Sequence, residues 1–300
     1  MCMLSFIIVS YKDRDYLIKN IESIRKNVRE IGYEIIIIDN AGDTELEKEI
    51  NGLFEGVRFY SLKKNEGYGA AVNFGVSRAK RKYICIANAD TEIIEGNVEA
   101  VCKKLDEEGI GLIGPKIVLS DYRVQISWAP KPTIMNEFLI ELRDLLYRLG
   151  LIDRIIFKHT ENEFYAEWLT GAFFFMRKDV FQGVKGFDET FFLYYEDTDL
   201  CMRLLDKGYK NLFYPYVKVL HYLGVSKKNV VSRAELEAKK SQLYFYRKHC
   251  SKLGFWMLRI YLFVKFYFKL IYYELIKGKD IDSIILIQQI INEVKLSKRF

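Results

Sequence analysis

Three short, almost purely apolar runs constrain the fold of this chain most strongly. They read LSFIIVS at 4–10, YEIIIID at 33–39 and KYICIANAD at 82–90. Their length and their β-branched residues predict strands that are buried on both faces. The segments 14–27 and 69–80 carry apolar residues at helical spacing. Because strands that alternate with helices form a parallel sheet covered on both sides, we expect a doubly wound α/β domain.

The remaining segments extend this pattern over most of the chain. We expect a weaker strand at 57–62, irregular strand-like structure at 111–135, a helix at 136–158, a strand and a turn at 166–181, a loop and then a helix within 185–209, and a strand at 211–224. No internal repeat or low-complexity segment interrupts them.

The composition of the 300 residues bounds the class of protein. Half of the residues are hydrophobic and 15% are aromatic, which supplies a packed core and argues against disorder. The five cysteines, at 2, 85, 102, 201 and 250, are odd in number and form no CxxC pair. They predict free thiols in a reducing compartment. The N-terminus has neither a basic region nor a small-residue cleavage site, so no signal peptide is expected there.

The C-terminal quarter differs in charge from the rest. Residues 225–300 contain 16 Lys or Arg and 6 Asp or Glu, a net charge of +10, whereas residues 1–224 carry a net charge of −4. Such a basic tail suggests an anionic partner. Nucleic acid is disfavoured, because the basic residues alternate with large aliphatic ones and no nucleic-acid-binding motif is present.

The segment 254–279 predicts an amphipathic helix within this tail. Its apolar run is interrupted by charges that fall within one half of a helical wheel: Arg259, Lys265, Lys269, Glu274 and Lys277. The charges argue against a membrane-spanning helix and favour a helix that lies in the membrane interface. A helix that packs on its own domain, or on a second copy in a homodimer, remains the alternative.

Polar side chains stand where the predicted strands end. They are Ser10 and Tyr11, Asp39 and Asn40, and Asn88 with Asp90. Sheets of this class bind ligands at the carboxyl ends of their strands. Asp39 could accept hydrogen bonds from a ribose or a base, or it could cap the next helix. Asn88 and Asp90 could present oxygens to Mg²⁺ or Mn²⁺ on a diphosphate, or they could form an Asx turn.

A glycine pair follows in the stretch NEGYGAAVNFG at 65–75. Gly67 and Gly69 lie at a loop-to-helix junction. Glycine allows a ligand to approach the backbone, and a helix N-terminus favours phosphate. The stretch is neither a Walker loop nor GxGxxG, so it carries only moderate weight by itself.

The stretch YYEDTDL at 194–200 places Glu196, Asp197 and Asp199 behind the aromatic run FFLYY. A solvated acidic turn is the simplest interpretation. A helix that begins near Asp197 would also pair Asp199 with Arg203 one turn later. The helix N-terminus lowers the pKa of a carboxyl there and apolar surroundings raise it. A carboxylate so placed could accept a proton in a dry cleft.

Seven motifs in order resemble the family 2 inverting glycosyltransferases of GT-A fold, nearest to the rhamnosyltransferase-like subgroup that builds cell-surface polysaccharides. The motifs are SFIIVSYKDRDYL, IIIIDNA, NEGYGAAVNFG, IANADTEI, WLTGAFFFMRKDVF, GFDETFFLYYEDTDLCMRL and HYLG, within about residues 4–225. The resemblance implies a GT-A fold, Rossmann-like with a mostly parallel sheet, over 1–225. A nucleotide-sugar half would span about 1–115 and an acceptor half about 116–225, followed by a basic, aromatic helical tail at 226–300.

The resemblance also implies a role for each motif residue. Ser10, Tyr11 and Asp39 would hold the nucleoside, with Asn65 and Gly67 lining the donor pocket. Asp90 would be the metal-binding Asp of a DxD motif in which Asn88 replaces the first Asp, and His221 a further ligand of Mg²⁺ or Mn²⁺. By itself, His221 would more often be structural. Trp168, Thr170 and Gly171 would shape the sugar and acceptor cleft, Glu196 would bind an acceptor hydroxyl, and Asp197 would be the general base.

The implied activity is that of an inverting hexosyltransferase. It would move a sugar, rhamnose being one candidate, from a nucleotide diphosphate sugar to a hydroxyl of a cell-surface glycan or lipid-linked acceptor. We expect it on the cytoplasmic face of the cell membrane. A polyprenyl-phosphate glycosyltransferase and a non-catalytic nucleotide-sugar or glycan-binding module are the alternatives. The second would be expected to lack Asp90 or Asp197. A glycoside hydrolase is disfavoured, because its two carboxylates should face each other across the sugar.

Overall fold

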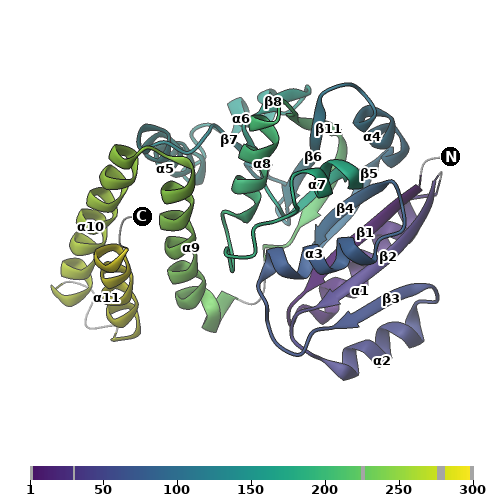
Figure 1. Cartoon of the computed structure of the whole chain (residues 1–300), viewed down its shortest axis with the longest axis horizontal. Coiled ribbons are helices and arrows are strands. Elements are labelled where there is room, and N and C mark those ends of the chain that lie inside the picture. Colours follow the sequence, from purple (N-terminus) through teal and green to yellow (C-terminus); the bar gives the residue numbers. More distant parts are fainter. Residues whose placement is uncertain (1–2, 30, 224–226, 276–280, 298–300) are drawn as a thin grey trace.

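A central sheet with helices on both faces forms the body of the protein, and three further helices stand at one side of it (Figure 1). The structure, a computed structural model, describes residues 3–29, 31–223, 227–275 and 281–297. The predicted boundary between residues 225 and 226 lies outside these ranges, as does Cys2. Cys85, Cys102, Cys201 and Cys250 are free thiols.

The N-terminal half of the sheet is parallel. Strands β1 (Met3–Ser10), β2 (Gly32–Asp39), β3 (Val57–Ser61) and β4 (Tyr83–Asn88) lie in the order β3-β2-β1-β4. The side chains of β1 and β4 are almost all buried, because helices cover both faces. The parallel α/β arrangement predicted from the apolar runs is therefore confirmed.

The other half of the sheet is mixed. Strand β10 (Phe173–Arg177) runs antiparallel between β4 and β6 (Ile110–Leu119). Strand β11 (Lys210–His221) lies parallel to β6 and antiparallel to the edge strand β5 (Thr91–Gly96). Strand β8 (Phe164–Ala166) pairs with β11, and β7 (Trp128–Ala129) with β9 (Trp168–Leu169) in a separate ribbon. Strand β5 did not emerge from the sequence, because it follows β4 after two residues.

The helices are α1 (Arg14–Asn27), α2 (Thr44–Leu53), α3 (Tyr68–Arg78), α4 (Val98–Leu105), α5 (Ile134–Arg148), α6 (Asp153–His159), α7 (Lys178–Gly183), α8 (Glu196–Asp206), α9 (Lys227–His249), α10 (Lys252–Leu275) and α11 (Ile281–Leu296). The single helix expected at 136–158 is two helices. Gly150 has a φ of +73° just after α5, a left-handed conformation that commonly ends a helix.

The packing of α3 depends on one glycine. A Cβ at Gly75 would lie 2.4 Å from Cγ2 of Ile7 and 3.1 Å from Cγ1 of Ile38. Only glycine lets the helix approach β1 and β2 this closely. This contact directs the N-terminus of α3 toward the carboxyl ends of the parallel strands.

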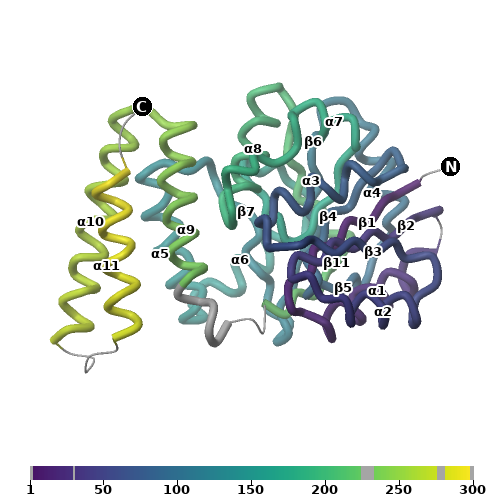
Figure 2. The backbone as a smooth tube through the Cα atoms, turned by 60° about the horizontal axis from the view of Figure 1, so that its bottom comes forward, coloured from purple at the N-terminus to yellow at the C-terminus, as the bar shows by residue number. Residues whose placement is uncertain are grey.

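The helices α10 and α11 form a hairpin beside α9 (Figure 2). The basic side of α10 faces the protein, and its side chains stay partly exposed. Lys265 pairs with Glu141 of α5, Lys269 with Glu235 of α9, and the Arg259 side chain donates to the carbonyl oxygen of Val294. The predicted helix is thus confirmed, but its charges are used within the molecule. Lys277 lies outside the described residues.

The opposite side of α10 is apolar and exposed. Its exposed side chains are Leu253, Trp256, Met257, Ile260, Val264, Tyr267, Phe268, Tyr272 and Leu275. No described helix is both long enough and apolar enough to span a membrane. A second apolar stripe is exposed on α5, at Met135, Phe138, Leu139, Leu142 and Leu145.

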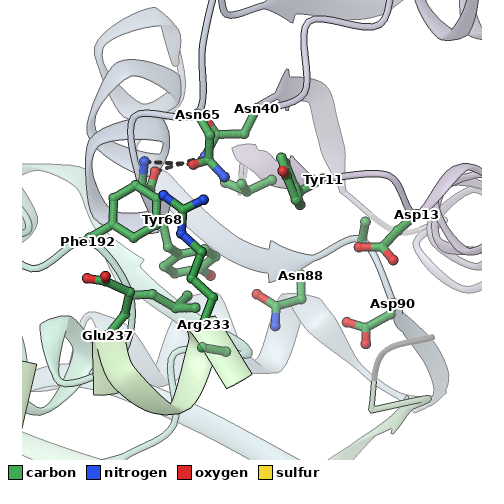
Figure 3. Close-up of a pocket in the computed structure, with 15 residues that line it drawn as sticks. Tyr11, Asp13, Asn40, Asn65, Tyr68, Asn88, Asp90, Phe192, Arg233 and Glu237 are labelled. Carbon is green, nitrogen blue, oxygen red and sulfur yellow. Dashed lines mark hydrogen bonds between the residues drawn. The ribbon is translucent and has the colours of Figure 1, made fainter. Parts of the chain in front are cut away.

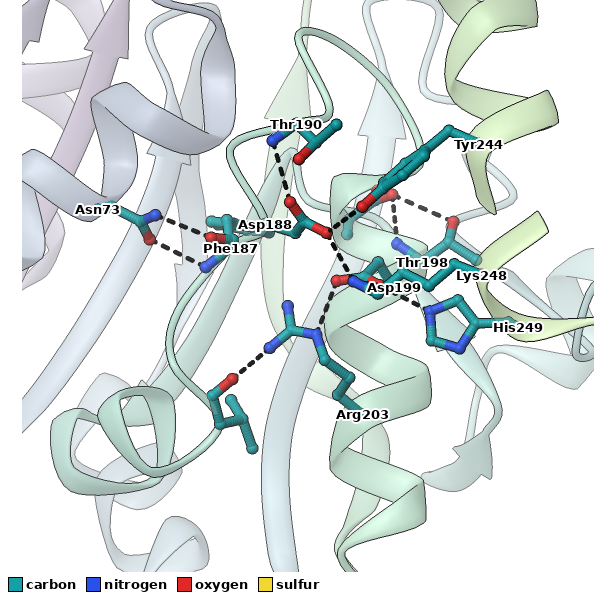
Figure 4. A network of polar contacts seen from close by, with 12 residues as sticks. Asn73, Phe187, Asp188, Thr190, Thr198, Asp199, Arg203, Tyr244, Lys248 and His249 are labelled. Atoms are coloured by element: carbon teal, nitrogen blue, oxygen red, sulfur yellow. Dashed lines mark hydrogen bonds and ion pairs between the residues drawn. The ribbon is translucent and has the colours of Figure 1, made fainter. Parts of the chain in front are cut away.

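A buried charge cluster joins α9 to α8 (Figure 4). Asp199 is fully buried, and its carboxylate contacts Arg203 Nε at 2.7 Å, Lys248 Nζ at 2.6 Å and His249 Nε2 at 2.7 Å. Burial opposes the charge of Asp199, but the hydrogen bond from His249 and the charges of Arg203 and Lys248 outweigh it and lower the pKa. The Asp199–Arg203 pair was predicted, whereas the two residues from α9 were not.

Candidate active site

Two adjoining cavities open at the carboxyl ends of β1 and β4. The first has a volume of about 560 Å³ and the second about 730 Å³. Both are lined by Tyr11, Tyr68, Asn88, Asp90, Leu193 and Ala234. Figure 3 shows the first cavity, with Asn65 and Tyr11 on one side and Arg233 and Glu237 of α9 on the other. Asn88 and Asp90 therefore lie where the two cavities meet.

The loop before α3 forms one wall of the first cavity. Gly67 has a φ of +91°, and a Cβ there would lie 2.6 Å from the carbonyl oxygen of Phe192. The N–H of Gly67 donates to Oδ1 of Asn65 at 2.9 Å. Asn40 holds the loop from β2, since its Nδ2 donates to the carbonyl of Gly67 and its Oδ1 accepts from the N–H of Glu66. The predicted residues Asn65 and Gly67 thus line the cavity. Asn40 was visible in the sequence only as a strand-end polar residue.

Ser10 and Asp39 lie deeper than the cavity walls. Both are fully buried, and neither belongs to the described lining of the two cavities. The carboxylate of Asp39 accepts hydrogen bonds from the N–H groups of Ala41 and Asp43, at 3.1 and 2.6 Å. Its oxygens hold the turn that leads into α2, where Asp43 is the N-cap. The part of these two residues in nucleoside binding stays a prediction, whereas Tyr11 lines both cavities.

The fold brings His221 to Asp90. Strand β11 pairs His221 with Thr91 of β5, so the imidazole lies beside the end of β4. Nε2 of His221 is 3.3 Å from Oδ1 of Asp90, and Nδ1 is 2.7 Å from Oε1 of Gln125. When Nδ1 donates to this amide oxygen, Nε2 is the ring nitrogen left to face Asp90 or a bound metal ion.

This pair has the chemistry of a partial metal site. Asp90 offers a carboxylate oxygen and His221 an imidazole nitrogen, both acceptable ligands of Mn²⁺. Within the described ranges, no group of three or more His, Cys, Asp or Glu side chains could hold a metal ion. A divalent ion here would need further oxygens from a bound molecule, as Mg²⁺ does at diphosphates. Gln125, which orients the imidazole, was not predicted.

Glu196 and Asp197 enter the second cavity from the first turn of α8. Tyr194 and Tyr195 before them both have a φ of +66°. Non-glycine residues rarely adopt this left-handed conformation, and such strain is concentrated at functional sites. The helix begins at Glu196, close to the predicted start.

Asp197 is a buried carboxylate held by two backbone donors. Its Oδ2 accepts from the N–H of Gly171 and its Oδ1 from the N–H of Thr198, each at 2.7 Å. Burial raises the pKa of Asp197 above its usual range, although these two hydrogen bonds oppose the rise. A carboxylate with a raised pKa is a better proton acceptor, so this residue has the properties of a general base.

Glu196, unlike Asp197, has a carboxyl oxygen without a hydrogen-bond donor among the described residues. This oxygen is Oε2, and the residue is 5% exposed. Burial first, and then the charge of Asp197, raise its pKa well above the usual range. A protonated Glu196 can donate a hydrogen bond into the cavity.

Thr170 and Gly171 line the second cavity, and Gly171 lies tightly against the base. A Cβ at Gly171 would be 3.0 Å from Cβ of Asp197 and 3.3 Å from its Oδ2. The hydroxyl of Tyr68, which was not predicted, donates to the carbonyl of Gly171 at 2.8 Å. Trp168 lies in β9 outside the described lining. Its indole N–H meets no partner under strict hydrogen-bond geometry, but its side chain is close enough to Asp197 to help oppose the rise in the pKa of that carboxyl.

Helix α9 contributes to both cavities. Arg233, Ala234 and Glu237 line the first, and Ala234, Glu235 and Ala238 the second. The sequence interpretation treated everything after residue 225 as an appendage, so these residues were missed. The sequence signal for this contact was weak. Ala234 and Ala238, one turn apart on a charged helix, indicate only that this side of the helix packs closely against another part of the protein.

Family models and curated relatives match this chain over most of its length. A model described as Glycosyl transferase family 2 matches residues 5–184, and one described as Glycosyl transferase family group 2 matches residues 133–273. The chain is similar to the rhamnosyltransferase WbbL of Escherichia coli K12, with 27% identity over 77% of this chain and 88% of that protein. The N-acetylglucosaminyl-diphospho-decaprenol L-rhamnosyltransferase of Mycobacterium tuberculosis is 23% identical over 74% of this chain and 76% of that protein.

Among solved structures, GalNAc-T7 with UDP, GalNAc and Mn²⁺ has a TM-score of 0.58 and 15% identity. The match covers 82% of this chain and about half of that one. At this identity the likeness shows the fold, which is the expected GT-A arrangement. Since the family 2 model spans more than half of the 300 residues, the chain belongs to glycosyl transferase family 2 and is a glycosyltransferase.

Proposed function

We propose that this enzyme transfers a hexose, with rhamnose as the first candidate, from a nucleotide diphosphate sugar to a hydroxyl of a glycan or polyprenyl-linked acceptor, with inversion. One observation carries the proposal: two cavities meet at Asp90, and a buried carboxylate, Asp197, lies in the second. The choice of rhamnose rests on the names of the two relatives given above, both of which are rhamnosyltransferases.

The first cavity is the proposed donor site. Tyr11, Asn65 and Gly67 line the part that would receive the nucleotide. The diphosphate would then lie near Asp90 and His221, which would hold Mg²⁺ or Mn²⁺. When bound, such an ion offsets the negative charge that develops on the leaving diphosphate.

The second cavity is the proposed acceptor site. Asp197 accepts the proton of the acceptor hydroxyl as its oxygen attacks the anomeric carbon from the face opposite the diphosphate. The new C–O bond forms while the bond from carbon to the phosphate oxygen breaks, so the configuration inverts. A positioned base contributes about 10²–10⁴-fold to the rate. Glu196 would hydrogen-bond a sugar hydroxyl, and the apolar walls would limit hydrolysis of the donor.

We propose that the exposed apolar side of α10 rests on the cytoplasmic surface of the membrane, where a lipid-linked acceptor lies. Its support is a run of large exposed side chains that includes Trp256, Ile260 and Phe268, together with the net charge of +10 after residue 224. Apolar surfaces of this extent mark interaction sites. Aromatic residues and basic tails suit an anionic lipid interface.

Vesicle sedimentation tests the membrane contact. The double variant Ile260→Glu and Phe268→Glu should lose binding to vesicles of phosphatidylglycerol and phosphatidylcholine. Leu53→Glu, an equally exposed position on α2, should bind as the unmodified chain does. Unchanged binding by the double variant would contradict the proposal. A dimer that the double variant disrupts in the absence of vesicles would assign the face to a second copy instead.

A donor panel tests the activity. dTDP-rhamnose, UDP-glucose, UDP-galactose, UDP-N-acetylglucosamine and GDP-mannose would be assayed for release of nucleotide diphosphate, with and without Mn²⁺ or Mg²⁺. We expect slow, metal-dependent release from one donor, with faster release when a lipid-linked glycan is added. Acceleration by polyprenyl phosphate alone would favour the charging of that carrier. No release and no thermal shift with any nucleotide diphosphate would refute a working donor site.

A further inference from the structure

Among the described side chains of helix α9, one basic group, that of Arg233, lines the first cavity. Arg233 extends from the helix toward the cavity, on the side opposite Asn65 and Tyr11 (Figure 3). Of the described residues that line this cavity, it is the only Lys or Arg, whereas Asp13, Asp90 and Glu237 are acidic. An anion that entered the cavity would be repelled by these carboxylates unless a cation lay nearby.

The described basic side chains further along α9 have partners within the protein. Lys240 pairs with Glu237, Lys248 with Asp188 and Asp199, and the guanidinium of Arg247 lies 5.3 Å from the ring centre of Tyr244. Arg233 is exposed and forms no ion pair with any described residue. Its charge is therefore available to a molecule in the cavity.

The position of Arg233 is fixed by the packing of its helix. Ser241, two turns later, is buried and donates from its hydroxyl to the carbonyl of Leu193 at 2.9 Å, and Leu193 lines both cavities. At its far end the helix is held by the contacts of Lys248 and His249 with Asp199. The guanidinium thus projects from an anchored element.

We propose that Arg233 binds the diphosphate of the donor from the side opposite the loop before α3. The inference rests on the proposed function, because it requires a nucleotide diphosphate in the first cavity. The planar guanidinium presents a fork of N–H donors that matches two phosphate oxygens, which the compact ammonium of lysine cannot do. The C-terminal region therefore supplies a part of the donor site.

Calorimetry on the full-length chain tests this role. Affinities for dTDP, UDP and the nucleosides thymidine and uridine would be measured at one Mg²⁺ concentration for the unmodified chain, Arg233→Ala, Arg233→Lys and Arg247→Ala. The last variant removes the same charge from the same helix outside the cavity. We expect Arg233→Ala to weaken diphosphate binding roughly tenfold to hundredfold, the loss of a charged hydrogen-bonding group, while nucleoside binding is unchanged. Arg233→Lys should restore only part of the loss, and Arg247→Ala should bind normally.

Two results would overturn the role of Arg233 and leave the proposed function intact. The first is an equal diphosphate affinity in Arg233→Ala and the unmodified chain. The second is an equal loss of nucleoside and diphosphate affinity in Arg233→Ala. If the unmodified chain bound no nucleotide diphosphate at all, the proposed function would fail as well. Because Arg233 is exposed, its variants should keep the thermal midpoint of the parent.

Discussion

Replacement of Asp197 by Asn removes the proposed base while keeping its size. Both carboxylate oxygens accept a backbone N–H at 2.7 Å, from Gly171 and Thr198. An amide has only one oxygen, so its NH₂ group must face one of these donors. The loss of that hydrogen bond should lower the free energy of unfolding by about 1–3 kcal/mol. For a chain of this size each kcal/mol lowers Tm by roughly 2–4 °C, so the variant should remain folded at 25 °C.

The catalytic loss should be far larger than the loss of stability. We expect kcat to fall by about 10²–10⁴-fold, the contribution of a positioned general base. Asp197 lines only the second cavity, so the affinity for nucleotide diphosphate should not change. The pH profile should change too. Because burial raises the pKa of Asp197, the parent should lose activity in acid at a pH above the ordinary carboxyl range, and this acid limb should vanish in the variant.

The assay is steady-state release of nucleotide diphosphate with donor and acceptor, measured from pH 4 to 9 beside calorimetric titration with the diphosphate. The matched control is Glu196→Gln, the same change of carboxyl to amide one residue earlier. A Gln side chain keeps a hydrogen-bond donor in the cavity, as protonated Glu196 does, so this variant should stay within about tenfold of the parent. Near-normal turnover by Asp197→Asn, or an unchanged acid limb, would show that another group accepts the proton.

Three further predictions concern the neighbourhood of this base. Gly171→Ala would place a methyl 3.0 Å from Cβ of Asp197 and should lower kcat roughly tenfold. The control Gly183→Ala, whose methyl would have no atom within 4 Å, should leave kcat unchanged. Steady-state kinetics of the two variants would test this difference. Folding raises the pKa of Glu196, so its ionisation costs stability as pH rises above the ordinary Glu value. Glu196→Gln should therefore raise Tm relative to the parent more at pH 8 than at pH 5, and the reverse trend would contradict the assignment. Folding lowers the pKa of Asp199, so Asp199→Asn should destabilise the fold by about 3–5 kcal/mol at pH 7, and in denaturant titrations the difference should shrink below about pH 4.

The parallel strands and the residues at their ends could be predicted because their signals are local. A run such as that of β2 has a two-sided apolar pattern that few other structures share. The positions of Asn88 and Asp90 follow directly, because the ends of neighbouring parallel strands lie together. The start of α8 near Asp197 was also readable from helix periodicity. The approach of His221 to Asp90 was not, because the two lie 131 residues apart and meet only through the pairing of β11 with β5.

The C-terminal helices show why contacts between distant elements could not be predicted. A helical wheel identifies which side chains of α10 share a side, but it does not say which side faces the protein. That depends on Glu141 and Glu235, which pair with Lys265 and Lys269 from other helices. These partly exposed ion pairs turn the basic side toward the protein and leave the apolar side outside. Asp39 illustrates the same limit. The helix cap that the sequence allowed for it is formed by Asp43, and the carboxylate of Asp39 holds the turn before that cap.

Helix α9 belongs both to the wall of the proposed donor cavity and to the C-terminal helical layer, so the stabilities of these two regions are coupled. Any ligand that binds the native cavity stabilises the native packing of α9 by RT ln(1 + [L]/Kd), about 2.7 kcal/mol when the ligand is at 100 times its Kd. By reciprocity, whatever orders the helical layer must tighten the ligand. On the proposed function, a catalytic core cut off before α9 would be an incomplete enzyme, and the C-terminal helices could not be exchanged for other helices without rebuilding the proposed donor site.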